Sequence, residues 1–300
     1  MTPYEELTRE YIAYIEELSG QAEKEMESAF KDATKILVFL YLSLPKEQGY
    51  SFRFDSSSSP VFEKLRTRLA EIAKKYETKA IDLSGAKNQE LFNRVMQTPE
   101  MKNWFARKIS GRTFSQRIWK YGNMYKMEME ARIAVGIVNG EREVAIISDI
   151  MKCLKNPYET LLVETKSDWA ARRLAVKFTP AEGTYISGFS NAQRLVRNEI
   201  FMAYRRADHE IWKSLKEVVG VRVYLNRAHP KVDMCDDLAG YYPKDFFFPG
   251  WHPRCICLSE PITAGEMIRE IPSKAREYMA DEKTGKYKSL TFYVDNLNYF

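Results

Sequence analysis

The feature that most limits the fold of this 300-residue chain is a spacing of apolar residues by three and four, which recurs through its first two thirds. In the first segment, Tyr4, Leu7, Tyr11, Ile15 and Leu18 follow this spacing, which is typical of one face of a helix. The same pattern predicts four later helices, which begin near residues 59, 113, 144 and 190. We therefore expect an N-terminal and central helical bundle with short connections.

Apolar faces and end signals can be assigned to several of these helices. The run from Ile36 to Leu42 indicates a buried helix end closed by Pro45. Ser59-Pro60 is typical of a helix start, and this helix is expected to reach about Tyr76. Its inward residues are Phe62, Leu65, Leu69, Ile72 and Ala73. The helix after Gly111 should stop at Asn139-Gly140, a common left-handed terminus. The next one is expected to bury Val144, Ile147, Met151 and Leu154.

The last part of the chain has a different character. A helix from Ser190 to about Leu215 carries a predicted buried stripe of Val196, Ile200, Ala203, Ala207 and Ile211. It is followed by Val218–Leu225, whose β-branched residues predict a strand, and Cys255–Leu258 is interpreted as a second one. The fold class is thus mainly α, with a small α+β C-terminal module and a Cys/His-rich loop. The predicted regions are 1–110 (N-terminal helices), 111–178 (central helices), 179–261 (the C-terminal module) and 262–300 (a tail).

Composition argues against several classes of protein. Hydrophobic residues make up 45% and charged residues 29%, which is unlike a disordered or membrane protein. The longest uncharged apolar run is about half of the ~20 residues that span a bilayer. The first residues lack the basic and apolar regions of a secretory signal, and four cysteines are too few for a disulfide scaffold. We therefore expect neither a secreted protein nor a membrane partner.

One short segment gathers most of the side chains that can bind a transition metal. Three of the four cysteines and two of the three histidines lie between His229 and Cys257. Thiolate and imidazole are ligands that zinc prefers, so a structural zinc ion is the predicted cofactor. The first candidates are Cys235, His252 and Cys255, with His229 or Cys257 as the fourth ligand. Asp233 is a sixth possible donor.

Other interpretations of this segment stay open. The thiols could be reduced and buried, since cysteine behaves as a small hydrophobe in a core. In a Cys-x-Cys strand the two side chains point to opposite faces, which argues against both reaching one ion. A cysteine nucleophile would need His229 or His252 as its base. A nuclease with a hard cation on Asp233, Asp236 and Asp237 would fit poorly beside thiols.

A possible contact with DNA rests on the arginines of the helix that begins near Ser190. Arg194, Arg197 and Arg205 are candidates for phosphate contacts. The alternative is an ordinary exposed helix face with neighbouring ion pairs. The net charge of +5, from 46 basic and 41 acidic residues, permits nucleic-acid binding without arguing for it.

The order of motifs in residues 111–261 resembles the phage minor head, or head-morphogenesis, proteins of the Mu F-like family. The most specific part is the His-Pro-x-Cys-x-Cys ending within Trp251–Cys257. It follows Arg197–Asp208 on a helix, a strand, His229, Asp233–Asp236, Gly240 and Tyr242–Phe246. The chain differs from the family in having Asn198 within its Arg-Asn-Glu, Ile256 between the last cysteines, and Asp233-x-Cys235 in place of a Cys-x-x-Cys.

This resemblance implies a structural protein of the virion and not an enzyme. Its expected partners are the portal protein and the major capsid protein, with packaged phage DNA as a further one. The expected location is the capsid interior or portal vertex, after assembly in the host cytoplasm. The competing hypothesis is a zinc-dependent hydrolase or nuclease that uses the His/Asp/Cys cluster. A structural ion would have four protein ligands, whereas a catalytic ion keeps one position for water.

Overall fold

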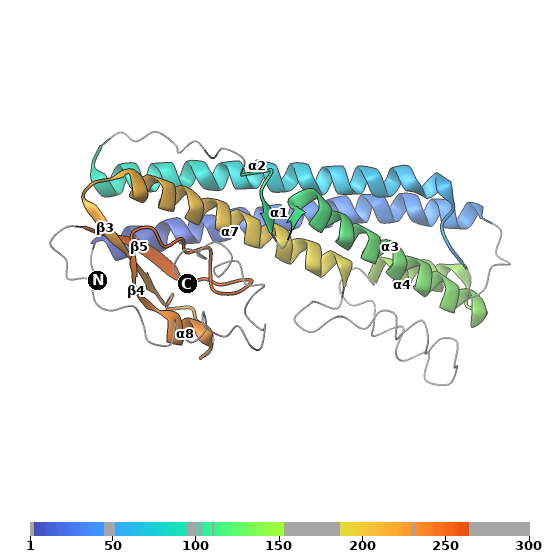
Figure 1. The fold of residues 1–300 in the computed structure, drawn as a ribbon. Helices are drawn as coiled ribbons and strands as arrows, with labels where there is room; N and C mark the ends of the chain where they lie inside the picture. Colours follow the sequence, from blue (N-terminus) through green and yellow to red (C-terminus); the bar gives the residue numbers. More distant parts are fainter. Residues whose placement is uncertain are drawn as a thin grey trace. The chain divides into compact units, whose positions relative to one another are not determined.

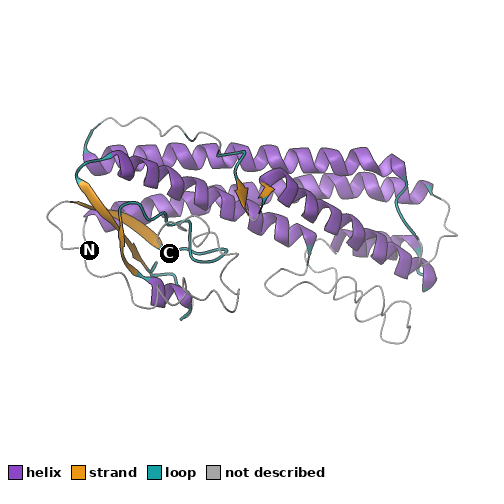
Figure 2. Ribbon diagram, in the orientation of Figure 1, coloured by secondary structure: helices purple, strands orange, loops and turns teal. Residues whose placement is uncertain are grey.

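A computed structural model describes residues 3–44, 52–94, 101, 104–109, 111–152, 187–229 and 232–263. Within these residues it contains six α-helices and a three-stranded antiparallel sheet (Figures 1 and 2), which confirms the predicted fold class. The helices are α1 (Pro3–Ser43), α2 (Ser59–Phe92), α3 (Phe114–Val138), α4 (Glu143–Lys152), α7 (Gly188–Ser214) and α8 (Met234–Leu238). The strands are β1 (Lys108–Ile109), β2 (Arg112–Thr113), β3 (Val218–Tyr224), β4 (Gly240–Pro243) and β5 (Leu258–Thr263).

The chain forms two compact units, each assembled from segments far apart in the sequence. The first unit combines Met1–Gln21, Ala73–Gly111 and Arg197–Phe300, and the second combines Ala22–Ile72 and Arg112–Val196. Residues 153–186 and 264–300, which hold parts of the predicted central region and most of the predicted tail, lie outside the described residues.

In the second unit, α3 begins and ends where the sequence predicts. The Thr113 hydroxyl accepts from the Gln116 amide, and the Gln116 side chain accepts from the Thr113 amide, which forms a capping box. The helix ends at Val138, and Gly140 follows with a φ of +67°. This left-handed conformation favours glycine, so the Asn139-Gly140 signal is confirmed as a helix terminus.

The core of the second unit is built on aromatic side chains. Phe30 of α1 lies edge-on to Tyr125 of α3, with ring centroids 4.9 Å apart, and edge-on to Phe189 of α7 at 5.0 Å. Thr34 and Tyr125 share a buried hydrogen bond between their hydroxyl groups. Edge-on pairs of this kind add to the stabilisation from burial alone, so the three helices are held together at this level.

Two predicted apolar faces are wrong. Helix α4 buries Ile146 and Ile150, whereas Val144 is 78% exposed. The side chain of Ile146 occupies the space where a β-carbon on Gly136 would lie, only 2.5 Å away. Because Gly136 has no side chain, Ile146 can pack against it. The buried face of α4 is therefore centred on Ile146 and Ile150, one residue before the predicted Ile147 and Met151. Likewise, the run at the end of α1 is not wholly buried, since Phe39 is 70% exposed.

In the first unit, α2 continues well past the predicted end at Tyr76 and brings polar side chains into the interior. The Lys87 ammonium forms a fully buried ion pair with Asp208 of α7. The other Asp208 oxygen accepts from Ser84 and Asn88, at 2.7 and 2.8 Å. Buried charges are tolerated when they are paired and hydrogen-bonded in this way, and the network fixes α2 against α7. The predicted inward residues of α2 and α7 are all buried.

The sheet of the first unit has the strand order β4-β3-β5, with β3 in the centre. Val221 pairs with Tyr242 of β4 on one side and with Pro261 of β5 on the other. The β3 strand is confirmed, but the second strand begins at Leu258 and not at Cys255. The connection from β3 through α8 and β4 to β5 contains all the predicted metal ligands.

Among the described residues, none of the helices combines the length and the apolar character that crossing a bilayer requires.

Candidate metal centre

The first thiol of the candidate centre is positioned by the short helix α8. Asp233 caps this helix: its carboxylate accepts from the Cys235 amide at 2.7 Å. The Asp233 amide in turn donates to Asp236, at 2.8 Å, which completes a capping box. Cys235 is therefore held in the first turn with no exposed surface. The sequence analysis missed α8, although the Asp-x-x-Asp spacing is its recognisable start signal.

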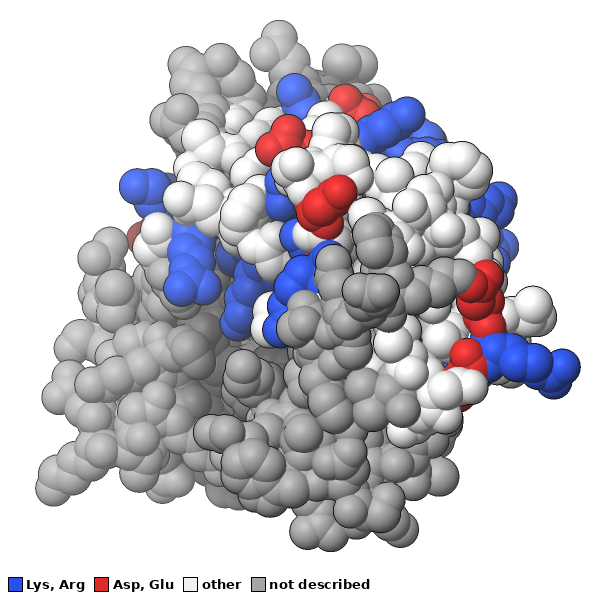
Figure 3. Space-filling model, turned by 90° about the vertical axis from the view of Figure 1, so that its right-hand side faces the viewer, with Lys and Arg blue, Asp and Glu red and all other residues white. Residues whose placement is uncertain are grey.

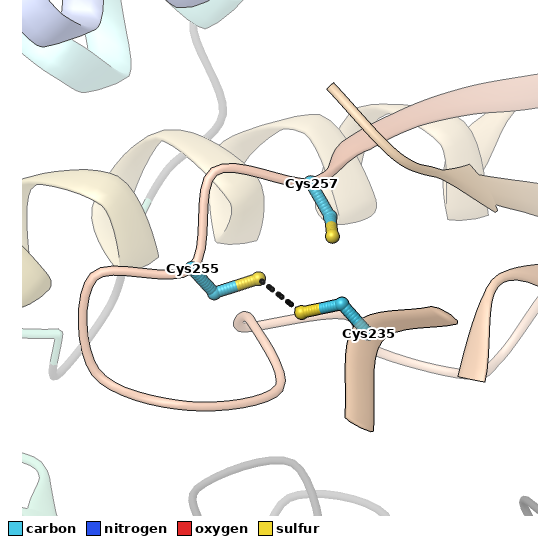
Figure 4. Close-up of side chains that lie close together, drawn as sticks. All are labelled: Cys235, Cys255 and Cys257. Carbon is cyan, nitrogen blue, oxygen red and sulfur yellow. Dashed lines mark hydrogen bonds between the residues drawn. The ribbon is translucent and has the colours of Figure 1, made fainter. Parts of the chain in front are cut away.

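The other thiols come from the segment between β4 and β5. The Cys255 amide donates to the His252 carbonyl at 3.0 Å, so His252-x-x-Cys255 forms one turn. Residues 255–257 have no regular structure, because β5 starts only at Leu258. The alternation of a strand does not apply to them, and the Cys257 sulfur points toward the same space as those of Cys235 and Cys255 (Figure 4). The argument that Cys255 and Cys257 face opposite ways was wrong for this reason.

The three cysteine sulfurs form one close group, and the imidazole of His252 lies beside one of them. The sulfurs of Cys235, Cys255 and Cys257 all lie within 4.8 Å of one another. The Cys235 and Cys255 sulfurs are 3.9 Å apart, and the His252 Nε2 lies 3.1 Å from the Cys235 sulfur. In a tetrahedral site with bonds of about 2.3 Å, two sulfurs are about 3.8 Å apart. Cys235, Cys255 and Cys257 are thus close enough to bind one metal ion.

The hydrogen bonds of His252 suit a ligand that binds through Nε2. Its Nδ1 lies 2.8 Å from the carbonyl oxygen of Pro253, which can only accept. Nδ1 therefore carries the proton and donates, and Nε2 presents its lone pair toward Cys235. A backbone carbonyl commonly orients a metal-binding histidine in this way.

A second group of donors shares Cys235 with the first. His229, Asp233 and Cys235 offer ligand atoms that also lie within 4.8 Å of one another. The His229 Nε2 is 3.4 Å from Asp233 Oδ1, while His252 Nε2 is 3.4 Å from Asp233 Oδ2. All six predicted ligands therefore lie in one neighbourhood, with Asp233 between the two imidazoles.

Arg205 of α7 is buried and hydrogen-bonds to the backbone of residues 249–257, the ligand segment, which carries His252, Cys255 and Cys257. Its Nη1 donates to the Pro249 carbonyl at 2.9 Å, and its Nη2 donates to the carbonyls of Cys255 and Cys257 at 2.9 and 3.0 Å. The guanidinium also lies over the ring of Phe248, 4.8 Å from its centroid. Arg205 is only 3% exposed, so the prediction that it contacts DNA phosphates is wrong.

An aromatic shell covers the thiols, and the sequence analysis did not assign it to the site. Tyr242 stacks on Phe246 with centroids 4.3 Å apart, and Phe248 lies 4.8 Å from Trp251. Trp251 has no exposed surface and belongs to the same core cluster as the three cysteines. Its position next to His252 in the sequence was the available signal. The shell keeps water from the sulfurs.

The three thiols differ in how easily they ionise. Hydrogen bonds to Cys255 and Cys257, together with burial, raise the pKa of the Cys235 thiol. Burial also opposes ionisation of Cys255, but hydrogen bonds from Cys235 and Cys257 and the charge of Arg205 outweigh it and lower the Cys255 pKa. Cys255 is therefore the first thiolate of the group, and the thiolate is the form that binds a metal.

Arg194 and Arg197, the other two residues proposed for phosphate contacts, also have partners within the protein. Arg194 donates to Asn191 at 3.1 Å, and Arg197 lies 4.0 Å from the Glu16 carboxylate. His209 of α7 is buried, and burial lowers its pKa to about 4. On the face drawn in Figure 3, lysine and arginine side chains are accompanied by acidic ones, in keeping with the small net charge.

Searches of protein-family models, of curated proteins and of solved structures find no match to this chain.

Proposed function

We propose that Cys235, Cys255, Cys257 and His252 hold a structural zinc ion, and that the protein is a phage minor head protein that acts in capsid assembly. The observation that carries the zinc site is the clustering of three buried sulfurs, with the His252 Nε2 lone pair directed at one of them, the sulfur of Cys235. The assembly role is supported by the resemblance of residues 111–261 to the Mu F-like family.

The charges around the site favour a divalent ion with these ligands. Three thiolates and one Zn²⁺ leave a single negative charge, and the neutral imidazole adds none. The Arg205 guanidinium, bonded to the carbonyls of Cys255 and Cys257, supplies one compensating positive charge. Without an ion, three thiolates could not coexist in this apolar shell, because each would repel the others.

The donor set favours a structural ion over a catalytic one. Four protein donors fill a tetrahedral site and leave no position for a substrate. The zinc-dependent hydrolase or nuclease of the competing hypothesis would need such a position on the same ion. The proposed ion would instead tie α8 to the segment before β5, where there is little regular structure.

Metal analysis of the purified full-length protein tests the zinc proposal. We expect zinc to co-purify with the protein, and Cys235→Ser and His252→Ala to lose most of it and to melt at a lower temperature. Cys153→Ser is the matched control, because it removes the remaining cysteine and leaves the cluster intact. Absence of zinc from the parent, with both cluster variants melting like it, would refute the proposal.

Co-expression with a portal protein and a major capsid protein tests the assembly role. We expect the chain to co-purify with the portal ring, and with capsids assembled in its presence. DNA affinity measured over a range of salt concentrations adds a separate test, since phosphate contacts predict a steep loss of affinity as salt rises. Hydrolysis of nucleic acid that depends on zinc and on His252 would instead favour the enzyme.

A further inference from the structure

The candidate centre has more donors than one tetrahedral ion can use. Cys235, Cys255, Cys257 and His252 complete the proposed zinc site, and His229 and Asp233 are left over beside it. Both belong to the second group, which also contains Cys235. The question is what these two side chains bind.

Of His229 and Asp233, His229 is the more informative. Its side chain is only 10% exposed, and its Nε2 is buried without a hydrogen bond. That nitrogen faces the Asp233 Oδ1 at 3.4 Å, and the His229 Nδ1 is 4.0 Å from Asp236. A buried imidazole nitrogen that makes no hydrogen bond is costly unless something binds it.

Asp233 lies between the two histidines and uses a different oxygen toward each. Its Oδ2 faces His252, which belongs to the proposed zinc site, and its Oδ1 faces His229. A carboxylate in this position can bridge two cations, as can the thiolate of Cys235. Paired metal ions in proteins lie about 3.5–4 Å apart, a separation that such bridges span.

We infer that His229, Asp233 and Cys235 form a second cation site, which takes a zinc-like divalent ion next to the first. Cys235 is the bridging thiolate, and Asp233 supplies the second bridge or a terminal oxygen. The mixed nitrogen, oxygen and sulfur donors suit a borderline ion such as Zn²⁺ or Co²⁺ better than Mg²⁺ or Ca²⁺. This inference rests on the proposed function, because the bridging thiolate must already belong to the first site.

The number of ions bound per chain tests the inference. Full-length protein is stripped with a chelator, reloaded with Zn²⁺, freed of excess metal and analysed by mass spectrometry. We expect about two ions per chain in the parent and about one in His229→Ala. Asp233→Asn should weaken the second ion while keeping α8, since asparagine is also a good helix cap. His209→Ala is the control, because it removes a buried histidine outside the cluster.

Substitution with Co²⁺ gives an independent readout. A shared thiolate couples two Co²⁺ spins, so the second equivalent should diminish the paramagnetic resonance signal of the first. In His229→Ala the paramagnetic resonance signal should persist at every ratio of Co²⁺ to protein. The sulfur-to-cobalt charge-transfer absorption of the first site should be retained.

The outcomes separate this inference from the proposal beneath it. One ion in both the parent and His229→Ala overturns the second site and leaves the structural zinc intact. Two results overturn the assignment of ligands to two sites: two ions in both the parent and His229→Ala, or one ion in the parent and none in His229→Ala. A parent without any bound zinc ends both proposals.

Discussion

Replacing Arg205 by methionine should be among the most damaging single changes in the first unit. Methionine keeps an unbranched apolar stem and favours a helix, but it cannot donate to the carbonyls of Pro249, Cys255 and Cys257. A buried acceptor that loses its partner costs about 1–3 kcal/mol. The cation over Phe248 adds about 1 kcal/mol. Methionine also removes the cost of burying a charged group, which offsets part of this loss. We therefore expect the free energy of unfolding to fall by about 3–5 kcal/mol.

The neighbouring Arg206 provides a matched control for this measurement. Its side chain is 35% exposed and pairs with Glu210 one turn along α7, at 2.6 Å. A pair of this kind contributes about 0.3–0.5 kcal/mol, and the guanidinium 4.9 Å from the centroid of Phe247 adds about 0.5–1 kcal/mol, so Arg206→Met should cost about 1 kcal/mol. Urea unfolding at one fixed zinc concentration, followed by tryptophan fluorescence, measures both variants. If Arg205→Met loses no more than Arg206→Met, the three carbonyl contacts do not support the ligand segment.

Three further changes test other parts of the fold. Gly250→Ala should cost about 1–3 kcal/mol in urea unfolding, because Gly250 has a φ of +109° and a β-carbon there would lie 2.5 Å from Nη1 of Arg205. Burial raises the pKa of Glu128 from 4.5 to about 8, so the folded state holds this proton more tightly and the parent should lose stability as pH rises from 4.5 to 8. Glu128→Gln should remove that loss of stability, which is at most about 5 kcal/mol in total, in unfolding measured at pH 5 and pH 9. Lys87→Met leaves the buried Asp208 carboxylate without a cation and should cost about 3–5 kcal/mol, part of which Asp208→Asn should restore in the double variant.

Elements with a repeating pattern could be predicted from the sequence. The buried stripe of α7 and the capping signals of α3 depend on local spacing, which is visible in the chain itself. The face of α4 could not be found in this way. Its apolar residues lie on both sides of the helix, and a contact of Ile146 with Gly136 decides which side is buried.

The candidate centre shows the same division between local and distant information. Its residue types and the turn from His252 to Cys255 follow from spacing within the chain. The role of Arg205 does not, because Pro249 and the cysteines lie far from it in sequence, and charge on a helix normally indicates an exposed face. The shared orientation of Cys255 and Cys257 depends on where β5 begins, which is fixed by its pairing with β3.

Arg205 and the proposed zinc ion would act on the ligand segment in different ways. Arg205 ties the backbone of residues 249–257 to α7, and this tie needs no metal. The ion would tie the side chains of the same segment to Cys235 and thus to α8. Removing zinc should therefore free α8 first, with faster amide exchange at Cys235 and Leu238 than at Ile211 of α7. Losing Arg205 should loosen the segment even when zinc is bound, because its carbonyls would no longer have donors.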